Sequence, residues 1–314
     1  MLLVPETWLT VIWVMVAQAI SGIAKDLNKM SAKSSMKSIA RDQDAGLYRI
    51  VAFLTGSKNA LKGAGFFIGA VLLSWLEFQG AIAAMVAMLS VVWLMSLLLL
   101  RQELGVMKAK PKFSQIFSKS EAVNRLSLAR FFLFGARDVW FVVALPVFLH
   151  EVLGWDFWQV GGYLAAWVMI YGMIQAAAPK LTGRSQAPDV VGRQLVVFGG
   201  CLALTPAAIG VALSYGLSPV FVVTVGLLIF ALLFAMNSAL HSFLIVRFAR
   251  DEGASLDIGF YYMANAGGRL AGTVGSGALY QWMGLEACLW VSAGLIAMAS
   301  LAAMSLPKGE VGTA

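Results

Sequence analysis

Residues 131–140 read Phe-Phe-Leu-Phe-Gly-Ala-Arg-Asp-Val-Trp and place two adjacent charges, Arg137 and Asp138, inside a run of apolar side chains. The run extends from Leu126 to Leu149, which at about 1.5 Å per residue is long enough for a helix to cross a lipid bilayer. A charge near the bilayer centre costs roughly 2.5–3.5 kcal/mol on insertion scales. The stretch therefore predicts a membrane-spanning helix whose charges meet a polar partner or a ligand.

The composition of the whole chain agrees with this interpretation. Of 314 residues, 60% are hydrophobic and only 12% are charged, which leaves too little polar surface to cover a soluble globule. The formal net charge of +7 resides in apolar segments and short loops, without the aromatic-interleaved basic face that nucleic acid binding needs. The sequence predicts an all-α, polytopic membrane protein with the lipid bilayer as its surroundings and no nucleic acid partner.

Apolar segments of membrane-spanning length recur along the chain. At about 20 residues per crossing we predict about nine transmembrane helices. Their approximate bounds are Trp8 to Lys29, Phe53 to Trp75, Ala81 to Leu100, Leu126 to Leu149, Phe157 to Ala178, Leu195 to Leu213, Val220 to Val246, Gly259 to Met283 and Ala287 to Leu306.

The loops that join these segments alternate in charge. Every second loop is basic, and the remaining loops carry no Lys or Arg. The basic loops are Lys33 to Arg49, Arg101 to Arg125, Lys180 to Arg193 and Arg247 to Asp257. The positive-inside rule places them in the cytoplasm, so we expect a multi-pass protein of the cell inner membrane with a cytoplasmic C-terminus.

The polar stretch 101–121 looks like a cytoplasmic linker between a partial three-helix bundle, 1–100, and a six-helix bundle, 122–314. A faint repeat relates the two. Asn59-Ala60 and Asn265-Ala266 are each followed about one turn later by a basic residue and then by glycines. Transporters are often built from such repeated halves, with the substrate at their interface.

The polar side chains inside the spans suggest a pathway for an anion, because several intramembrane cations need a polar cavity and a counter-charge. The candidate substrate-binding residues are Lys25, Lys58, Asn59, Lys62, Arg137, Asn265 and Arg269. Asp138 and Asp26 are candidates for proton coupling or charge compensation. Lys29 and Lys58, and to a lesser degree Lys25 and Lys62, could instead extend to the inner headgroups, as long lysine side chains do.

The charges at the centre of the predicted spans allow two interpretations. Adjacent helical residues point about 100° apart, so we expect Arg137 and Asp138 to face different partners. A structural ion pair with another helix is the alternative, and for Arg269 that partner could be Asp138.

Signatures of enzymes are absent, and we predict neither catalytic residues nor a metal or cofactor. His150 and His241 are far apart, and no His, Cys or carboxylate pair has metal-ligand spacing. The glycines Gly63, Gly65 and Gly69 favour close helix packing rather than nucleotide binding. Cys201 and Cys288 both fall in apolar stretches and are expected to be buried thiols.

Four stretches of the sequence resemble the major facilitator superfamily and, within it, the organoarsenical efflux permeases of the ArsJ type. They are Ser21 to Ser35, Leu54 to Gly63, Phe134 to Pro146 and Leu153 to Gly162. Relative to that pattern the chain lacks the first three helices, so its nine spans would correspond to helices four to twelve of a twelve-helix fold.

The resemblance implies export of 1-arseno-3-phosphoglycerate and hence arsenate resistance, with glyceraldehyde-3-phosphate dehydrogenase as the source of the substrate. That small molecule is strongly anionic, which suits Lys and Arg. Composition and spacing alone indicate only an organic anion. Two alternatives are therefore export of another phosphorylated or carboxylated metabolite, and a non-functional truncated fragment.

Overall fold

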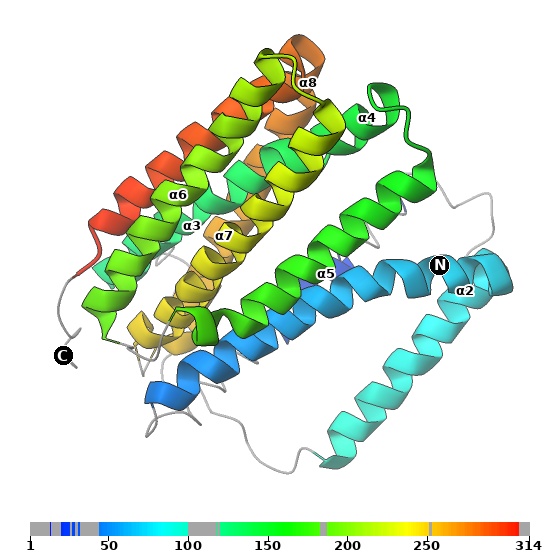
Figure 1. Cartoon of the computed structure of the whole chain (residues 1–314). Coiled ribbons are helices and arrows are strands. Elements are labelled where there is room, and N and C mark those ends of the chain that lie inside the picture. The colour runs from blue at the N-terminus through cyan, green and yellow to red at the C-terminus, as the bar shows by residue number, and fades with distance from the viewer. Residues whose placement is uncertain are drawn as a thin grey trace.

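The computed structural model describes residues 13, 20–25, 27–28, 31, 44–99, 118, 120–182, 187–250 and 253–307. Within these residues all regular secondary structure is α-helical, as predicted (Figure 1). The helices are α2 (Asp44–Leu99), α3 (Glu121–Phe141), α4 (Ala144–Glu151), α5 (Phe157–Leu181), α6 (Pro188–Ser214), α7 (Pro219–Phe248) and α8 (Ala254–Met304).

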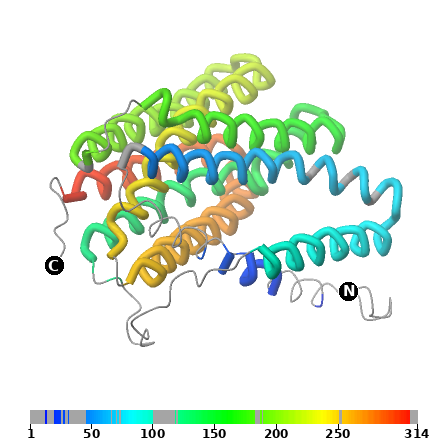
Figure 2. The backbone as a smooth tube through the Cα atoms, turned by 90° about the horizontal axis from the view of Figure 1, so that it is seen from below, coloured from blue at the N-terminus to red at the C-terminus, as the bar shows by residue number. Residues whose placement is uncertain are grey.

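The two longest helices, α2 with 56 residues and α8 with 51, exceed the length of one membrane crossing. Each doubles back on itself (Figures 1 and 2). The reversals fall at Glu77, with φ of 56°, and at Gly284, with φ of 73°, both inside loops predicted from the sequence. Glycine adopts this left-handed conformation without steric cost, whereas Glu77 is the only non-glycine residue with positive φ among the described residues.

Six helices of the described part are long and apolar enough to cross a membrane. The last eight predicted spans all fall on helical segments, because the reversals divide α2 and α8 into two segments each. The predicted span from Trp8 to Lys29 lies mostly outside the described residues, as do the linker 101–117 and the C-terminal residues from Lys308 onward. The count of nine and the division into two bundles stay predictions.

The predicted span from Leu126 to Leu149 is broken between α3 and α4 at Val142 and Val143. Proline explains the break. Pro146 has no backbone N–H, so the carbonyl of Val142, four residues earlier, loses its helical hydrogen bond. A separate bond, from the backbone N–H of Ala144 to Ser276 Oγ at 3.0 Å, fastens the start of α4 to α8.

Close helix approaches position the elements that carry the charges. A Cβ added to Gly56 on α2 would lie 2.7 Å from Ala176 Cα on α5, and one added to Gly272 on α8 would lie 3.0 Å from Gly135 Cα on α3. Small residues allow backbones to approach this closely. The pair α2 and α5 therefore lie side by side, as both views show (Figures 1 and 2).

Two predictions about small residues were partly wrong. Gly63 does pack, since a Cβ there would meet Ala165 O of α5 at 2.8 Å, but Gly65 and Gly69 face open space. Residues two and six positions after Gly63 point away from α5, because neighbours on one helix face are three or four apart. Likewise Cys288 is buried, whereas Cys201 is exposed on the outer face of α6.

A buried carboxylate fixes the start of α8, the helix that carries Asn265 and Arg269. Asp257 accepts hydrogen bonds from Arg250 Nε at 3.0 Å, Arg250 Nη2 at 2.9 Å and Ser118 Oγ at 2.6 Å. The hydrogen bond with Asp257 raises the pKa of Arg250 above its ordinary value. These bonds tie the segment before α8 and the segment before α3 to one carboxylate.

We expect Asp257→Asn to lower the free energy of unfolding by about 1–2 kcal/mol, since charge-assisted hydrogen bonds are lost but Arg250 is partly exposed. Unfolding of the purified protein with sodium dodecyl sulfate in detergent micelles measures the change. Asp189→Asn is the matched control, because the pair that Asp189 forms with Arg193 at 3.6 Å is exposed. Equal effects of the two substitutions would contradict the anchoring role of Asp257.

Candidate functional site

Asp138 lies fully buried on α3 and is paired with two arginines. Arg137 Nε donates to its Oδ1 at 2.7 Å, and Arg269 Nε, from α8, donates to its Oδ2 at 2.8 Å. The prediction that Arg137 and Asp138 face different partners was wrong. The arginine side chain is long and flexible enough to reach a neighbouring residue that points about 100° away on the helix. The contact is favourable because a buried carboxylate needs a counter-charge. The alternative pairing of Arg269 with Asp138 is the one observed.

Two lysines add further positive charge to this cluster. Lys62 on α2 interacts electrostatically with Arg137, Arg269, Lys25 and Asp138. Four cations and one carboxylate give these five side chains a formal sum of +3. The Arg269 side chain is 43% exposed and that of Arg137 is 13% exposed, whereas Asp138 is 0% exposed. The cluster, Lys25, Lys62, Arg137, Asp138 and Arg269, is called the Asp138 cluster below.

A further arginine, Arg130 on α3, is buried and was missed by the sequence analysis. Arg130 Nε donates to Asn265 Oδ1 at 3.0 Å, and Nη1 donates to Ser238 Oγ, also at 3.0 Å. Arg130 lies only four residues from the predicted end of its span, where a long side chain could reach headgroups. The available signal was its spacing from Arg137: residues seven apart on a helix share a face.

Two asparagines from the candidate set bond to protein side chains in this conformation. Asn265 accepts from Arg130, and Asn59 Nδ2 on α2 donates to Gln175 Oε1 on α5 at 2.6 Å. The amide of Gln175 in turn donates to Ser238 Oγ on α7 at 3.1 Å. A chain of hydrogen bonds therefore runs from α2 through α5 and α7 to α3 and α8.

The remaining candidates are placed as follows. Lys58 is exposed on α2, one turn before Lys62, and Lys25 is exposed in the short helical stretch 20–25. Asp26 and Lys29 lie outside the described residues. The structure thus pairs Arg137 and Arg269 with Asp138, places Lys62 and through it Lys25 within electrostatic range of this group, and places Asn59 and Asn265 in the neighbouring hydrogen-bond chain.

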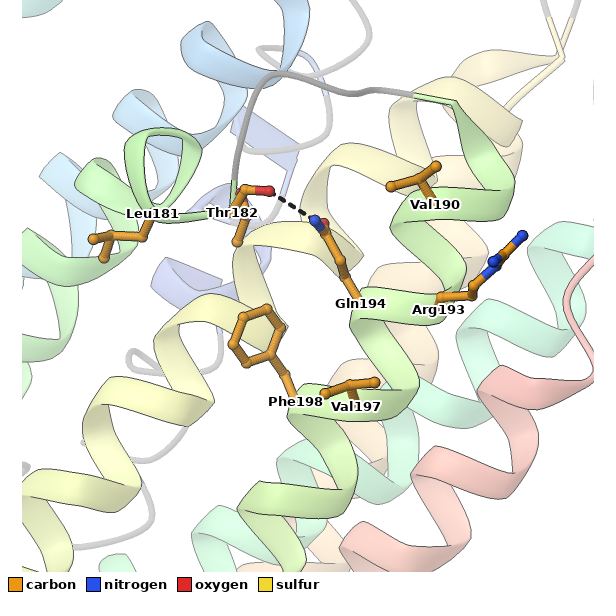
Figure 3. Close-up of a pocket in the computed structure, with 7 residues that line it drawn as sticks. All are labelled: Leu181, Thr182, Val190, Arg193, Gln194, Val197 and Phe198. Atoms are coloured by element: carbon orange, nitrogen blue, oxygen red, sulfur yellow. Dashed lines mark hydrogen bonds between the residues drawn. The ribbon is translucent and has the colours of Figure 1, made fainter.

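A pocket of about 360 Å³ lies elsewhere, between the end of α5 and the start of α6 (Figure 3). Its lining is mostly apolar, and Gln194 Nε2 closes one side by donating to Thr182 O at 2.7 Å. Arg193 is the charged residue of its lining. The pocket contains none of the cluster residues and therefore lies apart from the Asp138 cluster.

The comparisons with known proteins place the chain in a family. The sequence pattern of the Major Facilitator Superfamily matches residues 1–273 of the 314. A search of curated proteins found no match to the chain. In the described part of the chain, no group of three or more His, Cys, Asp or Glu side chains could hold a metal ion. Since the match covers far more than half of the sequence, the chain belongs to the Major Facilitator Superfamily of membrane transporters.

Proposed function

We propose that this secondary transporter exports a small, multiply charged organic anion, which binds at the Asp138 cluster. The supporting observation is the excess of positive charge: Asp138 pairs with Arg137 and Arg269, and Lys62 and Lys25 bring the cations to four, from four separate segments of the chain. Arginine forks and lysine ammonium groups bind phosphate and carboxylate oxygens through charge-assisted hydrogen bonds. The family supports transport rather than catalysis.

For the substrate itself we propose 1-arseno-3-phosphoglycerate, and arsenate resistance as the consequence. The support is the resemblance of the four quoted stretches to organoarsenical permeases, together with the charge of the site. Glyceraldehyde-3-phosphate dehydrogenase would supply this substrate when it uses arsenate in place of phosphate. Lys and Arg suit its two acidic groups.

The proposed mechanism alternates access to the cluster between the two faces of the inner membrane. Lys62 belongs to the proposed bundle 1–100, whereas Arg137 and Arg269 belong to 122–314, so a bound anion would join the two. In the empty transporter Asp138 would hold both arginines in place and balance part of their charge. Asp26, outside the described residues, is the second residue proposed for this balance.

Another phosphorylated or carboxylated metabolite remains the alternative substrate, because guanidinium groups bind carboxylate and phosphate alike. Competition among such anions for the same transport activity distinguishes the two.

The test of the site is uptake of labelled substrate into everted membrane vesicles. We expect Lys62→Ala and Arg269→Ala each to lower the initial rate at low substrate concentration by roughly tenfold or more, since each removes a charge-assisted contact. Lys180→Ala and Arg193→Ala are matched controls on exposed helix ends. Wild-type rates in both cluster variants would contradict the site.

A further inference from the structure

We infer that Arg130 forms a second anion-binding position, which takes the other acidic group of a substrate that carries one acidic group at each end. The inference rests on the proposed function, because it extends the Asp138 cluster by one further subsite. It concerns a residue that lies outside the cluster and has a separate set of partners.

Arg130 is a buried cation without a carboxylate partner among the described residues. Its residue exposure is only 5%. Its hydrogen bonds go to neutral groups: the Asn265 amide, the Ser238 hydroxyl and, at 3.5 Å, the Ser238 carbonyl. By contrast, Arg137 and Arg269 share Asp138. A buried charge without a counter-ion is strongly unfavourable, so intramembrane cations of this kind are signs of a ligand.

Arg130 lies near the Asp138 cluster. Both arginines of α3 contact the Phe134 ring, whose centroid lies 3.8 Å from Arg130 Cζ and 4.8 Å from Arg137 Cζ. On α8 the partners Asn265 and Arg269 follow the same order, one turn apart. The two positions are therefore separated by about 6 Å along α8 and about 10 Å along α3.

That separation fits a short chain with an acidic group at each end. In a three-carbon diol esterified with phosphate at both ends, the phosphorus atoms lie about 7 Å apart in the extended form, given bond lengths near 1.5 Å. A compound with a single phosphate can occupy only one of the two positions. The geometry thus points to a doubly ended anion as the preferred substrate class.

Buried hydroxyls lie close to Arg130 in the fold. Its Cζ lies 5.3 Å from the centre of the Tyr261 ring, and the hydroxyl of Tyr261 neighbours that of Ser242. Within the described part of the chain, neither of these hydroxyls nor Ser127 Oγ, one turn before Arg130 on α3, makes a hydrogen bond of good geometry. Buried hydroxyls normally have partners, and a hydroxyl can donate to a phosphate oxygen.

The hydrogen-bond chain to α2 provides a route by which this position opens. Ser238 bonds both to Arg130 and to Gln175, and Gln175 bonds to Asn59 of α2. Separation of α2 from α5 breaks the bond between Asn59 and Gln175. Gln175, Ser238 and then Arg130 would become accessible from the space that α2 had covered.

The experiment compares two probes, propane-1,3-diyl bisphosphate and propyl phosphate, by isothermal titration calorimetry with the full chain in detergent micelles. We expect the wild-type chain to bind the bisphosphate at least roughly tenfold more tightly, as one added charge-assisted contact implies. Arg130→Gln should reduce that preference to about twofold or less, because it weakens binding of the bisphosphate far more than binding of propyl phosphate. Arg193→Gln, an exposed arginine on α6, should preserve the preference.

The outcomes separate the two proposals. If neither probe binds the wild-type chain, the proposed anion site is wrong and this inference is overturned with it. If both bind equally well, or if Arg130→Gln weakens both by the same factor, the cluster binds anions but Arg130 is not a second position. Arg130→Lys, which keeps the charge, should retain part of the preference. This variant keeps the proposal testable if the glutamine variant does not fold.

Discussion

Replacing Asp138 with asparagine should lower the free energy of unfolding by about 3–5 kcal/mol, the usual range when one partner of a buried ion pair is removed. Asp138 is 0% exposed and its two carboxylate oxygens hold Arg137 and Arg269. An amide keeps the shape but leaves two guanidinium groups without their counter-charge. Unfolding with sodium dodecyl sulfate in detergent micelles, followed by circular dichroism, measures the loss.

A double-mutant cycle tells whether this loss comes from the ion pairs. Arg269→Gln alone leaves Asp138 paired with Arg137, so we expect a smaller effect than that of Asp138→Asn. In the double variant the two changes should not add, because residues in one network couple by about 0.5–3 kcal/mol. Simple additivity, or a loss below about 1 kcal/mol for Asp138→Asn, would contradict the role of Asp138 as the shared counter-ion.

Replacing Gly172 with leucine should prevent α2 and α5 from packing as observed. A Cβ at Gly172 would lie 2.7 Å from Gly56 O and 2.8 Å from Ala60 Cα, and these backbone atoms cannot turn aside. Overpacking usually costs about 1–3 kcal/mol, and a clash against backbone over a whole helix crossing should exceed that range. The hydrogen bond between Asn59 and Gln175, one turn away, should be lost with it.

The matched control lies on the same helix. Gly161 is exposed and has no atom within 4 Å of an added Cβ, so Gly161→Leu should change stability by less than about 1 kcal/mol. Unfolding in detergent compares the two variants directly. Equal stability of both would mean that α2 and α5 do not approach each other in the membrane as they do here.

The helices could be predicted well because each of them follows from the composition of its own segment of sequence. Apolar length defines a span, and the short gaps between predicted spans around Glu77 and Gly284 marked both reversals. The depth of Lys62, Arg137 and Arg269 in the membrane stays a prediction from their positions in the spans. The Asp138 cluster brings these three cations together, although no single span contains more than one of them.

Partners were harder to predict than positions, because they depend on how the helices cross. Arg269 meets Asp138 because Gly272 lets α8 approach Gly135 on α3 closely. The helical periodicity of the α8 sequence does not by itself predict where the two helices cross. Arg130 was overlooked for a related reason. Its distance from the span end favoured a headgroup contact, and only the packing of α7 and α8 against α3 reveals its burial.

The reversal at Gly284 has a consequence for the transport cycle. Because the turn contains no loop, the two halves of α8 form one stiff hairpin, and both halves are fastened to α3: Arg269 binds Asp138, and Ser292 Oγ donates to Ala136 O at 2.7 Å. We therefore expect α3 and α8 to move as one rigid unit that keeps the two arginines at a fixed spacing. In that case α2, with Lys62, is the helix that approaches the arginines and withdraws during the cycle.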